Sequence, residues 1–129
     1  HGQPEFASID VSFISLSLIL PPLAQILKMG GSVVALIKPQ FEAGKEHVGK
    51  HGIVRDRKVH EEVLQHVLGF ATADHFDVLG LDFSPIKGGQ GNIEFLAHLQ
   101  LVDREGRIAP EVDIDQTISA AYAELNKQD

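Results

Sequence analysis

Three charged residues stand at the borders of apolar segments, where each could do chemistry. Asp10 follows Ile9 inside one apolar run, Lys38 directly follows a second, and Glu94 lies at the start of a third. A charge at the end of a strand often simply reaches solvent, and for each residue alone this is the simpler interpretation. A buried charge needs a partner, because losing its water costs several kcal/mol. Two acids beside one lysine would satisfy one another, and such a set suits proton removal from a weakly acidic hydroxyl group.

A fold must bring these runs together, and the first third of the chain predicts a βαβ unit. Residues 6–13 have the pattern of a short buried strand, and residues 32–37 form a near-continuous apolar run typical of a parallel strand. Residues 16–28 between them are apolar at helical spacing, and Pro21 and Pro22 suit the first turn of that helix. The order strand, helix, strand indicates an open α/β sheet.

The rest of the chain predicts a helix, a hairpin and a last helix. Asp56 suits the N-cap of a helix with one apolar face. Residues 76–83 and 93–101 have strand patterns, and the turn-rich link between them indicates an antiparallel hairpin. Asp113 and Gln116 resemble a capping box at the start of the last helix.

These elements predict a mixed sheet whose strand order follows from its connections. The two parallel strands should be neighbours, the second hairpin strand should lie antiparallel beside residues 32–37, and the first hairpin strand should lie outside it. A ligand crevice in such a sheet lies at the carboxyl ends of the parallel strands. Asp10 and Lys38 both fall at such ends, and the hairpin would bring Glu94 to the same crevice.

The charge of the chain is acidic overall but uneven. A formal net charge of −7 is unlike that of most stand-alone nucleic-acid binders, because phosphate neutralisation supplies most of their affinity. Five of the eleven basic residues nevertheless fall between residues 45 and 58, and we assign them as candidate contacts to an RNA backbone. A solvated surface loop is the alternative that remains open. The five residues are Lys45, Lys50, Arg55, Arg57 and Lys58.

The composition argues against several other classes of protein. The chain has no cysteine, which excludes disulfides and thiolate zinc sites, and its seven histidines form no HExxH metal-binding motif. The longest apolar stretch, residues 13–27, is too short and too interrupted to span a bilayer, and no signal peptide is visible. We therefore expect a cytoplasmic protein with neither a metal nor a membrane partner.

Three segments resemble consecutive motifs of a known family. They are residues 10–15 (DVSFIS), 36–42 (LIKPQFE) and 84–96 (SPIKGGQGNIEFL). In this order they are similar to the hemolysin A (TlyA) family of bacterial rRNA methyltransferases, whose members combine an N-terminal S4 RNA-binding domain with a C-terminal FtsJ-like domain. The resemblance runs from about Pro4 to Leu101. It implies a partial Rossmann-like class I methyltransferase sheet, the last strands of a seven-strand mixed sheet ending in an antiparallel hairpin, with flanking helices.

The resemblance also gives roles to the three charged residues. FtsJ-like enzymes carry a Lys-Asp-Lys-Glu catalytic set, in which Asp10 matches the Asp, Lys38 the second Lys and Glu94 the Glu. The first Lys has no counterpart in these 129 residues. Asp10 would also contact the cofactor, S-adenosylmethionine, but the family's glycine-rich cofactor loop has no counterpart either. Residues 1–129 would therefore be the C-terminal portion of the methyltransferase domain, without the S4 domain and without the half that carries the cofactor loop.

Three interpretations of function are open. In the first, the parent protein transfers a methyl group from S-adenosylmethionine to a ribose 2′-hydroxyl of rRNA, on cytidine, with ribosomal RNA or ribosomal subunits as partners. In the second, the protein is membrane-active like a hemolysin and has no enzymatic activity, although an acidic net charge and the lack of a spanning segment argue against this. In the third, the isolated fragment is an inactive structural piece, whose first strand would be an exposed edge and could drive self-association.

Overall fold

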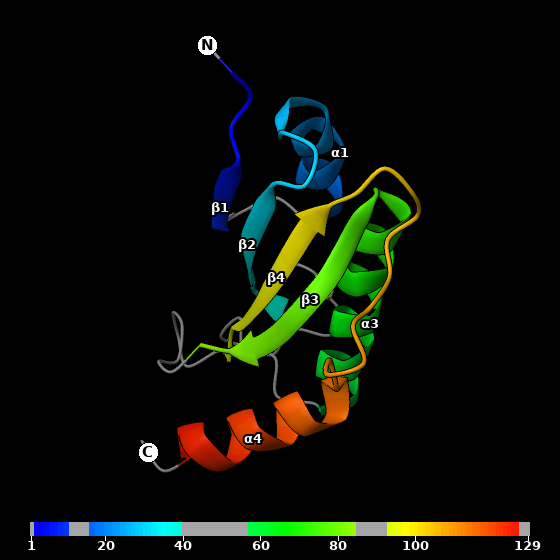
Figure 1. Cartoon of the computed structure of the whole chain (residues 1–129). Coiled ribbons are helices and arrows are strands. Elements are labelled where there is room, and N and C mark those ends of the chain that lie inside the picture. Colours follow the sequence, from blue (N-terminus) through cyan, green and yellow to red (C-terminus); the bar gives the residue numbers. More distant parts are fainter. Residues whose placement is uncertain (1, 11–15, 40–56, 85–92, 127–129) are drawn as a thin grey trace.

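The computed structural model describes residues 2–10, 16–39, 57–84 and 93–126 (Figure 1). These residues form a sheet and helices of an α/β fold, as the sequence predicted. In chain order the elements are β1 (Phe6–Asp10), α1 (Leu16–Ile26), β2 (Ser32–Ile37), α3 (Arg57–Ala73), β3 (Phe76–Phe83), β4 (Phe95–Leu101) and α4 (Ile114–Asn126).

The strands lie in the order β1-β2-β4-β3. β1 and β2 are parallel, whereas β4 is antiparallel to both β2 and β3. This confirms the predicted order, in which the second strand of the hairpin lies between β2 and the first strand of the hairpin. Within the described residues, β1 runs from Phe6 to Asp10. Residues 11–13 of the predicted strand and the predicted N-cap Asp56 lie outside the described residues.

One face of the sheet is buried, and successive side chains along each strand point alternately toward this face and away from it. Val33, Ala35 and Ile37 of β2 lie on this face beside Ala97 and Leu99 of β4, and none of them is more than 2% exposed. α3 packs along the sheet and contacts α1 (Figure 1). The intervening residues of β2 and β4 point to the opposite face, where they are half-buried or exposed. We call this second face the open face.

α3 presents the apolar stripe that its sequence predicted. Ala71 completes this stripe, whereas Phe70 is 41% exposed and stacks against His66. The stripe also contains one polar residue, His60. The apolar residues that α3 buries are Val59, Val63, Leu64, Val67, Leu68 and Ala71.

The prolines of α1 are not where the sequence analysis expected them. Pro21 and Pro22 lie inside the helix rather than in its first turn, because the helix already includes Leu16. Each proline lacks the N–H that would bond to the preceding turn, which weakens the helix locally. Both rings are exposed, so the buried residues Leu16 and Leu20 still pack against the core.

The chain between β4 and α4 runs along the outer side of β3. The Val78 amide donates a hydrogen bond to the Arg107 carbonyl (2.9 Å), and the Ala109 amide donates to the Val78 carbonyl (2.8 Å). α4 then begins with the predicted cap, in which the Asp113 carboxylate accepts a hydrogen bond from the Gln116 amide (2.9 Å). The helix lies across the N-terminal end of α3 (Figure 1).

Candidate active site

The ends of the two parallel strands carry an ion pair. Nζ of Lys38 lies 2.7 Å from Oδ1 of Asp10. Asp10 is in register with Leu36, and Lys38 lies two residues further along, so Lys38 follows Leu36 on the open face and can reach back to its neighbour. The Lys38 side chain is 15% exposed and that of Asp10 is 61% exposed. The sequence predicted that these two residues meet at the carboxyl end of the sheet, and they do.

The third predicted residue, Glu94, lies at the same end of the sheet. Ile37 and Phe95 are partners in the β2–β4 register, so the residue after Ile37 and the residue before Phe95 face each other across the two strands. The pKa of Glu94 is raised, chiefly because burial disfavours its charged form; the Lys38 charge acts against this and the Asp10 charge adds to it. The charges of Lys38 and Asp10 therefore both act on the pKa of Glu94, and the structure brings the three residues into one cluster.

The Asp10–Lys38–Glu94 cluster suits work on a hydroxyl group. An ammonium group held by a carboxylate can stabilise negative charge that develops on an attacking oxygen. A glutamate with a raised pKa is a stronger base than an ordinary one and can receive a proton. The half-exposed carboxylate of Asp10 also leaves room for a second contact, for example with an amino or hydroxyl group of a ligand.

The predicted RNA-contacting residues are described only in part. Lys45, Lys50 and Arg55 lie outside the described residues, and Lys58 is an exposed residue in the first turn of α3. Arg57 is occupied within the chain: its Nε donates to Glu61 (3.2 Å), and its Nη2 donates to the Asp115 carbonyl and to the Ser119 hydroxyl (2.9 Å each). In the structure, therefore, Arg57 joins α3 to α4, a role that its place in a run of basic residues did not suggest.

His60 is a further residue of interest that was not predicted from the sequence. This residue is 1% exposed and forms a hydrogen bond through Nδ1 with the Tyr122 hydroxyl of α4. Its ring also meets the ring of Phe95 edge-on, with the centroids 5.9 Å apart. The sequence did hold a signal that His60 is buried. It lies four residues before Leu64, and this spacing places it on the apolar stripe of α3.

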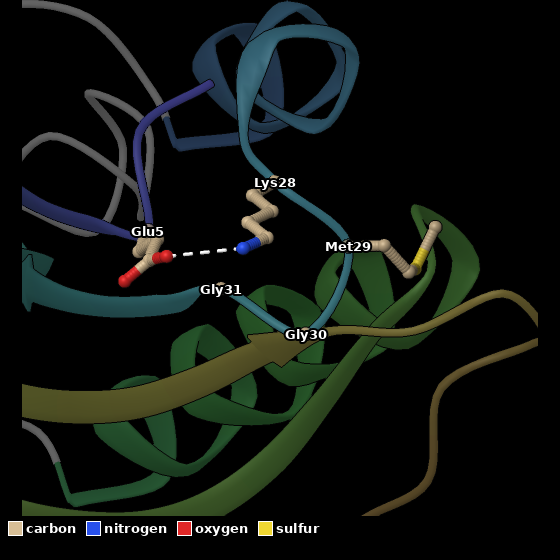
Figure 2. Close-up of a pocket in the computed structure, with 5 residues that line it drawn as sticks. All are labelled: Glu5, Lys28, Met29, Gly30 and Gly31. Carbon is tan, nitrogen blue, oxygen red and sulfur yellow. Dashed lines mark hydrogen bonds and ion pairs between the residues drawn. The ribbon is translucent and has the colours of Figure 1, made fainter. Parts of the chain in front are cut away.

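A pocket lies at the opposite end of the sheet from the cluster. Figure 2 shows its lining, which includes Met29 and the two glycines that follow it. An ion pair between Lys28 Nζ and Glu5 Oε1 (3.1 Å) crosses it, so its two charges are already paired. Gly30 adopts a positive φ of 85°, as expected for the turn that closes α1. We therefore place the candidate site at the cluster and not at this pocket.

The described part of the chain contains neither a metal cluster nor a membrane-spanning helix. Residues 2–10, 16–39, 57–84 and 93–126 hold no group of three or more histidine, aspartate or glutamate side chains arranged to bind a metal ion. Within the same ranges, no helix combines the length and the apolar character needed to cross a membrane.

The sequence matches a known family and several named relatives. A family model described as FtsJ-like methyltransferase matches residues 1–101. YqxC of Bacillus subtilis, provisionally named an rRNA methyltransferase, is 53% identical over 129 residues, which is 98% of this chain and 46% of the relative. Hemolysin A of Brachyspira hyodysenteriae is 42% identical over 95 residues (74% of this chain, 40% of the relative). TlyA of Mycobacterium tuberculosis, named a 16S/23S rRNA (cytidine-2′-O)-methyltransferase, is 34% identical over 99 residues (77% and 37%).

This chain thus spans less than half the length of each of these relatives. Two solved structures have the same fold. A protein of Streptococcus thermophilus, provisionally named a hemolysin, superposes with a TM-score of 0.93 at 57% identity over 98% of this chain and 46% of its own. A similarly named protein of Lactococcus lactis gives a TM-score of 0.88 at 57% identity over 92% of this chain and 56% of its own. Because the family model matches most of the chain and both structures reproduce its fold, the chain belongs to the FtsJ-like methyltransferase family.

Proposed function

We propose that the full-length protein transfers a methyl group from S-adenosylmethionine to the 2′-hydroxyl of a cytidine in ribosomal RNA, and that Asp10, Lys38 and Glu94 are catalytic residues. The observation that carries the proposal is the 2.7 Å ion pair between Lys38 and Asp10 at the carboxyl ends of two parallel strands, with Glu94 beside it. The three residues fall on the motifs that resemble the hemolysin A family. The name of the mycobacterial relative supports the cytidine 2′-oxygen as the target.

The cluster has a specific task in this reaction. S-adenosylmethionine, when bound, supplies an electrophilic methyl group on a sulfonium centre. Transfer of this methyl group to the ribose 2′-oxygen would break its bond to sulfur and would require the hydroxyl proton to leave. The ammonium of Lys38 stabilises the charge that develops on the oxygen. The proton passes to the Glu94 carboxylate, whose raised pKa favours this.

The described residues fit the cofactor only in part. Asp10 suits a contact with it, because its carboxylate ends a strand and is 61% exposed although one oxygen is paired with Lys38. The glycines Gly30 and Gly31 lie at the other end of the sheet and cannot cradle a ligand beside Asp10. We therefore propose that residues 1–129 form the C-terminal portion of the methyltransferase domain. On this proposal the cofactor loop and an S4 domain belong to other parts of the full-length protein, and the isolated chain is inactive.

Ribosomal RNA, free or in ribosomal subunits, is the proposed partner. Lys45, Lys50, Arg55 and Lys58 are the proposed contacts to its phosphates, because they follow β2 closely in the chain and β2 leads into the cluster. Arg57 belongs to this set by sequence, but its contacts with α4 support a structural role instead. We place the protein in the cytoplasm, where ribosomal RNA is available.

The decisive experiment is methylation of rRNA by the full-length protein with labelled S-adenosylmethionine, followed by mass spectrometry of the modified nucleoside. A 2′-O-methylcytidine is the expected product. A liposome leakage assay on the same preparation tests the alternative, a membrane-active protein without enzymatic activity. Leakage without any methylated nucleoside would refute the proposal in favour of that alternative.

A further inference from the structure

A pair of buried residues lies directly next to the catalytic cluster. Ile37 of β2 and Phe95 of β4 are partners in the strand register, and both side chains are 0% exposed. Lys38 directly follows Ile37 in the chain and Glu94 directly precedes Phe95, so the positions of the two charged residues depend on the positions of this pair. A displacement of Phe95 would therefore change the spacing between Glu94 and Lys38.

A buried histidine packs against Phe95 on the covered side of the sheet. His60 of α3 meets the Phe95 ring edge-on, with 5.9 Å between centroids and an interplanar angle of 66°. It is the one buried polar residue in the described part of the chain. A polar ring among apolar side chains is costly to bury unless it is hydrogen-bonded, so an apolar residue would be the ordinary choice at this position.

The partner of His60 comes from α4. The Tyr122 hydroxyl forms a hydrogen bond with His60 Nδ1, and the two rings meet edge-on with centroids 5.6 Å apart. The guanidinium of Arg57 lies 5.9 Å from the centre of the Tyr122 ring, and it donates to the Ser119 hydroxyl. A continuous set of contacts thus leads from α4 through His60 to Phe95, the first residue of β4, which directly follows Glu94. α4 itself lies beyond residues 1–101, the part that the family model matches.

We propose that Tyr122 is a positioning residue for the Asp10–Lys38–Glu94 cluster. Its hydroxyl orients the His60 ring, and the ring holds Phe95 and thereby the spacing between Glu94 and Lys38. Such support matters because a displacement of about 1 Å at a reacting group can cost about 10²-fold in rate. The inference rests on the proposed function of the cluster, and it makes α4 part of the structure that supports catalysis.

The first test compares two variants of α4 in the full-length protein. Tyr122→Phe removes the hydroxyl and keeps the ring beside Arg57. Ile118→Val loosens the packing of α4 at a fully buried position and leaves the hydrogen bond to His60 in place. At a temperature where both variants are folded, Tyr122→Phe should lower the single-turnover methylation rate by about tenfold with little change in KM, within the range for small misplacements. The rate of Ile118→Val should stay within about twofold of wild type. Equal rates in the two variants would overturn the proposal.

The second test asks whether Tyr122 acts through His60. His60→Phe keeps an aromatic ring against Phe95 but cannot bond to the Tyr122 hydroxyl. If the two residues act as one unit, the double variant with Tyr122→Phe should be no slower than the slower single variant. Rate losses that multiply would show that Tyr122 acts independently of His60, contrary to the proposal.

A third measurement does not depend on methyl transfer. Amide hydrogen exchange of β4 from Phe95 to Ala97 should be faster in Tyr122→Phe than in Ile118→Val, because only the first variant loses the support beneath the strand. A wild-type protein that fails to methylate rRNA would sink the proposed function, and exchange would still decide whether Tyr122 supports the strand. Equal exchange in both variants would refute the positioning role even in an active enzyme.

Discussion

The ammonium of Lys38 and the carboxylate of Asp10 lie 2.7 Å apart but differ in exposure, at 15% for the lysine side chain and 61% for the aspartate. The lysine is therefore held in a sheltered position by an acid that still has access to solvent. Such an arrangement keeps the amine in one place while the carboxylate remains able to contact a ligand. On the far side of Lys38, Glu94 completes the cluster.

Replacing Lys38 with alanine in the full-length protein should abolish methyl transfer and leave cofactor binding nearly intact. In the proposed mechanism the lysine acts on the 2′-oxygen in the transition state, and general acid–base or electrostatic contributions of this kind are worth about 10²- to 10⁴-fold in rate. Single-turnover methylation and calorimetric binding of S-adenosylmethionine measure the two effects. Lys28→Ala is the matched control, because Lys28 is also paired with an acid, Glu5, but at the other end of the sheet. A methylation rate of Lys38→Ala above about a tenth of the wild-type rate would show that Lys38 is not a catalytic residue.

Glu94 should make the stability of the protein depend on pH. Its pKa in the folded protein is raised above the ordinary value of 4.5, so the folded state favours the protonated form. This contribution to stability is fully present below pH 4.5 and is lost as the pH rises through the folded pKa. Glu94→Gln cannot ionise, so it should gain stability relative to wild type between acid and neutral pH. Thermal unfolding of both proteins across this range checks the sign. A difference that stays constant with pH would contradict it.

The basic residues between positions 45 and 58 should contribute to RNA binding through their charge alone. Replacing Lys45, Lys50 and Arg55 with alanine in the full-length protein should weaken rRNA binding and make it less dependent on salt. The slope of the logarithm of the binding constant against the logarithm of the salt concentration should become shallower by about 0.7–0.9 for each phosphate that the variant no longer neutralises. Arg57→Ala should instead lower the thermal stability, because its hydrogen bonds go to α4. Binding isotherms at several salt concentrations measure the first effect, and thermal unfolding measures the second. An unchanged slope in the triple variant would mean that the segment is only a solvated surface.

Gly106 should tolerate no side chain. A Cβ at this position would lie 1.9 Å from the carbonyl oxygen of Phe76, which is backbone and cannot move aside cheaply. Gly106→Ala should therefore destabilise the fold by about 1–3 kcal/mol or more. Gly69→Ala, on α3 with nothing within 4 Å of the added carbon, should stabilise it by about 0.5–1 kcal/mol. Chemical denaturation of both variants tests the contrast, and similar losses in the two would argue against the close approach of Gly106 to Phe76.

The 129-residue chain should self-associate through β1. Within the described residues this strand pairs with β2 alone, and its first residue, Phe6, is 59% exposed. An unpaired apolar strand edge invites pairing with another chain. Light scattering at rising concentration should show growth in mass, and Phe6→Lys should suppress it, because a charge on an edge strand opposes pairing. A chain that stays monomeric at high concentration would refute this prediction.

Local patterns along the chain predicted the elements and their order. The apolar run of residues 32–37, the strand pattern of residues 93–101, the helical spacing of the α3 stripe and the Asp113 cap are properties of neighbouring residues. Each predicted element was confirmed, although β4 begins at Phe95 and not at residue 93. The order of the strands also followed, because a βαβ unit and a hairpin leave few ways to pair. The exception was the proline pair of α1, since a weak local preference does not determine where a helix begins.

The sequence by itself therefore determined the α/β class, the strand order and the candidate residues Asp10, Lys38 and Glu94. Only the tertiary structure decided how these residues meet. The 2.7 Å ion pair and the burial that raises the Glu94 pKa depend on strand register and on what packs beneath it. The bonds of Arg57 and His60 to α4 join residues about sixty positions apart in the chain, at separations of 58 and 62. No periodic pattern encodes such contacts, because they arise when two helices pack.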